Sequence, residues 1–143
     1  LAIKYSEELL QATWKRENET VAEKIQEAHF ETSILTYNDE NALACVISLA
    51  YYSARTYYTE IRELPSGKGF ADIVYLPRKE HRDKPAMIIE LKWNKDAESA
   101  INQIKERNYP HTLKDYQGNL LMVGINYNPK TKVHECLIER LAI

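Results

Sequence analysis

Apolar residues near the start of the chain recur at helical spacing. From Ser6 to Phe30 they lie near one stripe, with mostly charged residues elsewhere: Leu10, Trp14, Val21, Ile25 and Ala28. A helix with one apolar stripe buries that stripe against a core. We therefore predict a helical segment here, and the polar residues Asn18 to Thr20 predict a break that divides it in two.

A second apolar repeat predicts a helix that lies in the core. Its members recur at three- and four-residue steps: Leu43, Val46, Ile47, Ala50 and Ala54. Asn38 or Asp39 stands at the expected start, where a side-chain oxygen can accept hydrogen bonds from the first backbone amides.

The next three apolar runs have the character of strands. Tyr57–Leu64 and Gly69–Leu76 flank a turn at Pro65-Ser66-Gly67, and so short a connection predicts an antiparallel hairpin. Ala86–Trp93 is almost continuously apolar, which is typical of a strand covered on both faces. We predict that it is the central strand.

The last third of the chain predicts one more helix and two more strands. Asp96 can cap a helix whose apolar positions follow at helical spacing, and Pro110 closes that segment. A buried strand is expected from Asn119 to Tyr127, followed by a turn at 128–130 and a final strand at 132–138. The strand-helix-strand unit is expected to be a right-handed crossover between parallel strands.

The element order defines a fold class. It predicts one α/β (α+β) domain with a mixed central sheet of about five strands flanked by helices, in the order α-βββ-α-ββ after an extra N-terminal helical segment. The 143 residues, 44% hydrophobic and 28% charged, suit a single globular domain. We divide it into a helical segment, residues 1–31, and a core, residues 32–143. Because the chain begins with Leu1, we expect it to be excised from a longer protein.

The composition limits the expected location and chemistry of the protein. No apolar run approaches the roughly 18 residues of a membrane span, and no secretory signal is present, so we expect a soluble, cytoplasmic domain without a membrane partner. Cys45 and Cys136 lie in apolar contexts and are expected to be reduced core residues. The four histidines have no metal-ligand spacing and are expected to be surface or structural residues.

Charge is distributed unevenly along the chain. Residues 1–54 carry four basic and nine acidic side chains, whereas residues 55–143 carry 15 basic and 12 acidic ones. Several basic residues flank the second and third predicted strands: Lys68, Arg78, Lys79, Arg82, Lys84 and Lys95. They fit either a rim that contacts phosphates or an ordinary solvated face.

Three charges interrupt apolar strands, which is costly unless a partner or a metal compensates. Glu90 and Lys92 are two apart and therefore share a face of the predicted central strand. Asp72 lies in the neighbouring run. Two carboxylates with few other ligands suit a hard divalent cation. Glu40, in the first turn of the second helix and on its apolar face, is a third candidate, although helix capping alone also explains an acid there.

Five blocks carry a resemblance to a known family, in this order: Asn38-Asp39-Glu40-Asn41, Gly67-Lys68-Gly69-Phe70-Ala71-Asp72, Glu90-Leu91-Lys92-Trp93, Gln103-Ile104 and Val123-Gly124-Ile125-Asn126-Tyr127. Together they resemble the PD-(D/E)xK nuclease superfamily. More narrowly, they are similar to the nuclease-like C-terminal domain that follows an AAA-ATPase-like domain in many bacterial proteins. The resemblance spans about 32–139 and implies a restriction-endonuclease-like core.

The resemblance also implies a role for each site residue. Asp72 and Glu90 would bind Mg²⁺ or Mn²⁺, with the Leu91 carbonyl and with Glu40 directly or through water. Lys92 would orient or help activate the attacking water and stabilise transition-state charge, and Gln103 would contact the site or the substrate. Two positions depart from the pattern. Ala71 stands where the superfamily's name has proline, and Arg107 stands where some members have a tyrosine, with Tyr109 two positions further.

The resemblance implies metal-dependent hydrolysis of phosphodiesters, with DNA as the expected substrate and an ATPase-like domain of the parent chain as a partner. An alternative is a non-catalytic module of the same fold that binds nucleic acid or protein beside an ATPase. A third interpretation makes Glu90 and Lys92 a structural ion pair. Self-association is left open.

Overall fold

The computed structural model describes residues 2–31, 40–66, 69–106, 113, 116 and 119–140. Within these ranges the side chains at 2–3, 30–31, 40–42, 63–66 and 69–72 are outside the description. The elements follow in this order: α1 (Ala2–Trp14), α2 (Asn18–Glu31), α3 (Glu40–Ala50), the 3-10 helix η1 (Tyr52–Thr56), β1 (Tyr58–Ser66), β2 (Gly69–Pro77), the 3-10 helix η2 (Lys79–His81), β3 (Ala86–Trp93), α4 (Ala97–Glu106), β4 (Leu120–Asn128) and β5 (Val133–Arg140).

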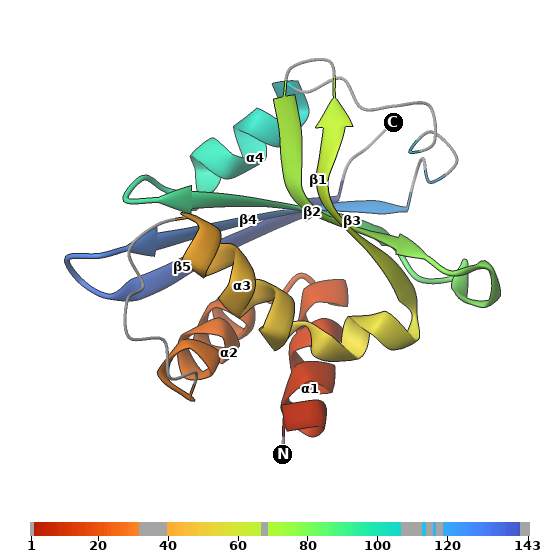
Figure 1. The fold of residues 1–143 in the computed structure, drawn as a ribbon, viewed down its shortest axis with the longest axis horizontal. Coiled ribbons are helices and arrows are strands. Elements are labelled where there is room, and N and C mark those ends of the chain that lie inside the picture. The colour runs from red at the N-terminus through yellow and green to blue at the C-terminus, as the bar shows by residue number, and fades with distance from the viewer. Residues whose placement is uncertain are drawn as a thin grey trace.

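Five strands form one mixed sheet in the order β1-β2-β3-β4-β5 (Figure 1). β3 and β4 are parallel, and the other neighbouring pairs are antiparallel. The predicted fold class, the β1–β2 hairpin and the central place of β3 are therefore confirmed. The crossover helix α4 connects the two parallel strands, as the sequence predicts.

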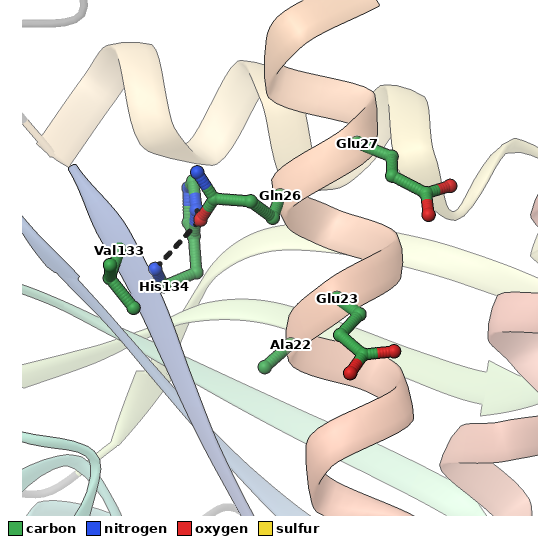
Figure 2. A pocket seen from close by; sticks show the side chains of 6 residues that line it. All are labelled: Ala22, Glu23, Gln26, Glu27, Val133 and His134. Carbon is green, nitrogen blue, oxygen red and sulfur yellow. Dashed lines mark hydrogen bonds between the residues drawn. The ribbon is translucent and has the colours of Figure 1, made fainter.

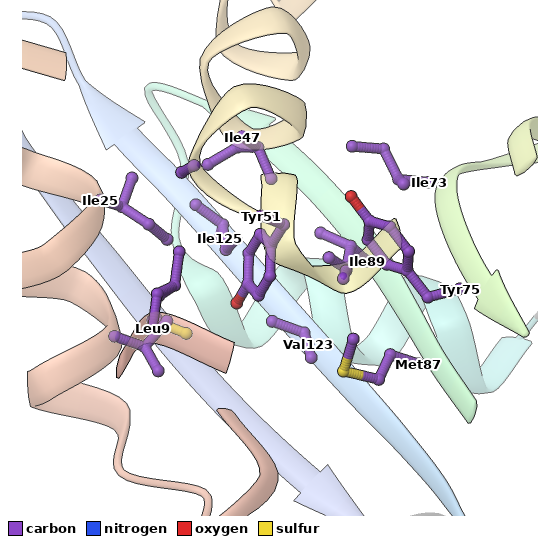
Figure 3. Packing of buried hydrophobic residues seen from close by; sticks show 14 of the residues in the cluster. Leu9, Ile25, Ile47, Tyr51, Ile73, Tyr75, Met87, Ile89, Val123 and Ile125 are labelled. Carbon is purple, nitrogen blue, oxygen red and sulfur yellow. The ribbon is translucent and has the colours of Figure 1, made fainter. Parts of the chain in front are cut away.

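Helices cover both faces of the sheet, with α1, α2 and α3 on one side and α4 on the other (Figure 1). Alternate residues of β3 divide between two apolar clusters, because successive strand side chains point to opposite faces. Met87 and Ile89 pack with the three N-terminal helices, as Figure 3 shows. Ala86 and Ile88 pack with α4 instead. β3 is thus covered on both sides, which explains its continuous apolar character.

The N-terminal segment does divide into two helices, but the break lies earlier than predicted. α1 ends at Trp14, and Arg16 has a φ of 58°, a left-handed conformation that stops a helix. Asn18 is not part of the break, because it begins α2 and its Oδ1 accepts a hydrogen bond from the Ile138 amide at 3.0 Å. This bond connects α2 to β5.

One of the two cysteine predictions is wrong. Both thiols are free, as predicted, but Cys45 is exposed whereas Cys136 is buried. Cys45 lies on α3 away from the buried positions Leu43, Val46 and Ile47, so its apolar sequence neighbours face the core while it faces solvent. Burial raises the pKa of the Cys136 thiol.

Candidate active site

Glu90 and Lys92 lie near the C-terminal end of β3. They share the strand alternation of Ala86 and Ile88, so they belong to the face that α4 covers. Glu90 is 3% exposed and Lys92 is half-buried. A carboxylate so far removed from water is stable only where bonds or positive charge compensate for lost hydration. This burial distinguishes Glu90 from an ordinary surface acid.

Helix α4 brings Gln103 to Lys92. The Lys92 Nζ donates a hydrogen bond to the Gln103 Oε1, across 11 positions of sequence. Because an ammonium group has only donors, the amide oxygen of Gln103 must face it. The Gln103 NH₂ group is therefore not the group that faces Lys92. Sequence analysis expected Gln103 to contact the site, and the structure places it on Lys92.

Two carboxylates fix the beginning of α4. The Asp96 Oδ1 accepts a bond from the Ser99 amide at 2.6 Å, so the predicted cap is confirmed. Bonds from the Ser99 side chain and amide hold the pKa of Asp96 below its usual value. The Glu135 Oε1, on β5, accepts a bond from the Ala97 amide at 2.6 Å. β5 therefore helps to orient the helix that carries Gln103.

Gly124 lets α4 approach the sheet closely. It is the β4 residue opposite Glu90 in the parallel register. A Cβ added at Gly124 would lie 2.6 Å from the Ala97 carbonyl oxygen and 3.0 Å from the Ala100 Cβ. Any larger residue would push the helix away from the strand that carries Glu90.

Asn126 holds the loop between β3 and α4. It lies opposite Lys92 on β4 and is 4% exposed. Its Oδ1 accepts a bond from the Lys95 amide at 3.0 Å, and its Nδ2 donates to the Lys95 carbonyl at 3.1 Å. Sequence analysis gave Asn126 no role, although it shows the same signal as Glu90, a polar residue inside an apolar strand.

Asp72 comes directly after the last β2–β3 pair, at the end of the ladder where Glu90 also follows. Ile73 of β2 pairs with Ile89 of β3 in an antiparallel register. Asp72 precedes Ile73 and Glu90 follows Ile89, so both come next at the same end of this ladder. Neighbouring strands are about 4.8 Å apart. The Asp72 side chain is outside the described residues, so its part in the site stays a prediction.

Glu40 is the first residue of α3, as the sequence predicts. α3 packs on the opposite face of the sheet from α4 and contacts β3. The Glu40 side chain and the predicted caps Asn38 and Asp39 lie outside the described residues, as do Arg107 and Tyr109. A contact between Glu40 and Glu90 is therefore also still a prediction.

The predicted basic rim does not surround this site. Arg78, Lys79, Arg82 and Lys84 all precede Ala86, where β3 begins. Lys92 is six residues further along β3, which is about 20 Å at the usual rise per strand residue. Of the predicted rim, Lys95 is near the site, and Lys68 lies outside the described residues.

The donor chemistry fits a hard divalent cation. The Glu90 carboxylate and the Leu91 carbonyl supply oxygen ligands, which Mg²⁺ and Mn²⁺ favour. Among the described side chains, no group of three or more His, Cys, Asp or Glu residues is placed to hold a metal ion. A complete site therefore needs a further carboxylate, and the predicted one is Asp72, which follows the last β2–β3 pair.

A hollow lies between α2 and β5, on the face of the sheet opposite Glu90 and Lys92. Its volume is about 440 Å³, and Figure 2 shows its lining residues: Ala22, Glu23, Gln26, Glu27, Val133 and His134. The Gln26 Oε1 accepts a bond from the His134 amide at 2.9 Å and lies 2.6 Å from its Nδ1. His134 is 4% exposed, in agreement with a structural role.

Comparison with known families agrees with this geometry. The model of the PD-(D/E)XK nuclease superfamily matches residues 25–136, more than half of the chain and all of the candidate site. The chain therefore belongs to the PD-(D/E)XK nuclease superfamily, whose members are generally nucleases and typically use divalent metals. Searches of curated proteins and of solved structures found no significant match. Among the described helices, none has the length and apolar character needed to cross a membrane.

Proposed function

We propose that this domain hydrolyses phosphodiester bonds of DNA with the help of Mg²⁺ or Mn²⁺. The main support is the Lys92–Gln103 hydrogen bond beside the buried Glu90, inside the region that matches the nuclease family. A surface lysine needs no such partner. Here a residue of the following helix holds the Lys92 ammonium group, two strand positions from a buried carboxylate.

The proposed metal ligands are carboxylate and carbonyl oxygens. Glu90, Asp72 and the Leu91 carbonyl would hold the ion, with Glu40 directly or through water. The ion would lower the pKa of an attacking water and neutralise phosphate oxygens. A cation at Glu90 would also compensate for the hydration that this carboxylate loses on burial.

Lys92 would orient the attacking water and stabilise negative charge that develops on the phosphate. Gln103 restricts the positions that the long Lys92 side chain can adopt, and such restriction is how a site holds a group in a reactive position.

The sequence resemblance alone supports one further point. We propose that an AAA-ATPase-like domain precedes this domain in the parent chain. The family match at residues 25–136 concerns the nuclease domain and not an ATPase-like domain.

Cleavage assays test the proposed activity. Labelled duplex DNA, single-stranded DNA and RNA would be incubated with stringently purified protein and Mg²⁺, Mn²⁺ or EDTA. We expect metal-dependent cleavage that EDTA abolishes, with DNA cut faster than RNA. Binding without cleavage under every metal condition would support the non-catalytic interaction module instead.

Calorimetric titration of Mn²⁺ tests the metal site separately. We expect binding to wild type and loss of at least tenfold in affinity in Glu90→Gln. Glu98→Gln is the matched control, because Glu98 is an exposed acid in the first turn of α4. Equal weakening by both substitutions would show a general charge effect and contradict a site at Glu90.

A further inference from the structure

The connection between β2 and β3 concentrates positive charge. Residues 78–84 hold four cations, Arg78, Lys79, Arg82 and Lys84, and two acids. We call these four cations the basic cap. Three of them are exposed and Lys84 is half-buried. This group covers the N-terminal end of β3, the end away from Lys92.

Aromatic rings hold two of the cap cations in place. The Arg82 guanidinium lies 5.0 Å from the centre of the Tyr116 ring. The Lys84 Nζ lies 4.6 Å from the Trp14 ring and 5.7 Å from the Tyr57 ring. Cation–π contacts of this kind limit the motion of long side chains, so less conformational entropy is lost when the cations bind an anion.

Among the described residues, one carboxylate forms an ion pair with the basic cap. Of its four cations, Lys84 is the one with an ion pair in the described part of the chain. Its partner Asp83 is 3.5 Å away and 71% exposed, and such surface pairs are weak. The Arg78 Nε donates to the Arg55 carbonyl, which orients the guanidinium without cancelling its charge. The cap therefore offers positive charge to a polyanion.

Arg82 connects the cap to the side of the sheet that holds the candidate site, whereas Lys84 packs on Trp14 and Tyr57, which belong to the cluster on the other face. Tyr116, beneath Arg82, packs against the apolar cluster on the α4 face, which is also the face of Glu90 and Lys92. The distance along β3 from Ala86 to Lys92 is about 20 Å. At about 3.4 Å per base pair, six base pairs of duplex cover that distance.

We propose that the basic cap is a second contact surface for the phosphate backbone of a duplex whose other part occupies the candidate active site. This inference rests on the proposed nuclease function for its substrate. The chemistry favours a duplex over a single strand. Single-strand surfaces need aromatic faces on which bases stack, whereas here Arg82 and Lys84 lie over the rings. Backbone contacts by fixed cations suit a stiff duplex.

The test compares two double variants that remove the same charge. Lys79→Gln with Arg82→Gln changes the cap. Lys4→Gln with Lys24→Gln is the matched control, because Lys24 also lies 5.0 Å from a tyrosine ring, that of Tyr5, but on the acidic N-terminal helices. Urea denaturation first checks that both variants fold like wild type.

Binding to a labelled duplex of about 20 base pairs is measured in EDTA, so that no cleavage is needed. At about 0.1 M salt we expect the cap variant to bind at least tenfold more weakly, and its log–log salt slope to fall by about 2 in magnitude. The control should bind within about twofold of wild type. Equal affinities of cap variant and wild type, equal weakening of both variants, or no duplex binding by wild type would overturn the proposal. A loss confined to single strands would also overturn it.

Kinetics separate this inference from the proposed function. With a long duplex the cap variant should show a raised KM and unchanged kcat. With a hairpin stem of about five base pairs, too short to reach the cap, it should match wild type. If wild type cleaves nothing but the cap variant loses duplex binding, the proposed function fails and the cap stands. If wild type cleaves and the KM of the cap variant is unchanged, the proposed function stands and the proposal for the cap fails.

Discussion

At the scale of single residues, the contact between Lys92 and Gln103 carries the most functional weight. A lysine has four rotatable bonds, and its ammonium group is useful to a reaction only if it stays near the reacting atoms. The Gln103 Oε1 provides that restraint. We therefore propose for Gln103 a positioning role that is separable from substrate binding.

We predict that Gln103→Leu lowers kcat by about 10- to 100-fold and changes KM less than threefold, because Lys92 loses its restraint. Gln103→Glu keeps an oxygen acceptor and should restore most of the rate. Steady-state kinetics on duplex DNA measure both variants. If the glutamate variant is as slow as the leucine variant while both fold normally, Gln103 does not act through Lys92.

A second residue-scale prediction concerns acid stability. Burial, together with the nearby charge of His29, lowers the pKa of His134 to about 4, and burial lowers the pKa of His29. The unfolded chain binds a proton at each histidine near pH 6.5. Between about pH 6.5 and 4 the unfolded state thus holds more protons, so stability is present above pH 6.5 and is lost as the pH falls.

We predict that the free energy of unfolding of wild type falls by about 2 kcal/mol more than that of His134→Gln between about pH 7.5 and 5. Urea denaturation at both pH values measures the difference, and titration of other groups is common to both proteins. Identical pH dependence of the two proteins would show that His134 is not a buried neutral histidine.

At the scale of elements, the contact between α4 and β4 connects stability to the site. We predict that Gly124→Ala destabilises the fold by about 1–3 kcal/mol, because its Cβ would meet the Ala97 carbonyl. The displaced helix carries Gln103, so kcat should fall as well. Ile125→Val is the control, since Ile125 faces the other apolar cluster and its cost is also about 1 kcal/mol.

Urea denaturation and cleavage kinetics measure both variants. Loss of stability with loss of kcat in Gly124→Ala, and loss of stability alone in Ile125→Val, supports the account. Wild-type stability of Gly124→Ala would contradict the close approach of α4.

The elements themselves could be predicted from the sequence because their signals are local. Alternation, helical spacing and the Asp96 cap act within one element, and the turn at Asn128 fixes a hairpin. Features that depend on the folded backbone and on how the elements pack could not be predicted. Cys45 has apolar sequence neighbours but faces solvent. Arg16 ends a helix through a left-handed backbone, which no glycine signals in the sequence.

In the candidate site, too, local features could be predicted from the sequence, whereas contacts between elements could not. Charges inside apolar strands were sufficient to select Glu90 and Lys92, because the cost of burial is a property of the residue. Asn126 is also a polar residue inside an apolar strand, but its bonds to the Lys95 backbone depend on the folded loop and cannot be predicted from the sequence. The four cap cations precede β3 and adjoin its N-terminal end, whereas Lys92 lies near the other end, so a position that flanks the strand does not bring them to the site.

At the scale of the whole molecule, the sheet separates two kinds of chemistry along β3. One end holds Glu90 and Lys92 under α4, and the other holds the basic cap. A duplex that contacts both ends would be positioned by contacts between its phosphate backbone and the cap. It would be cut at the end that holds Glu90 and Lys92. The N-terminal helices cover the opposite face, where Lys84 packs on Trp14, so we expect the substrate to approach the α4 face and to meet the cap at Arg82.

Cleavage by wild type and by Lys92→Ala is the most direct measurement. Duplex DNA with Mg²⁺ or Mn²⁺ is the substrate, and Lys105→Ala is the control because Lys105 is an exposed residue of α4 paired with Glu139 at 3.0 Å. The account predicts that Lys92→Ala loses at least 100-fold in rate with an unchanged unfolding midpoint, while Lys105→Ala cleaves like wild type. Equal cleavage by wild type and Lys92→Ala after stringent purification would contradict it.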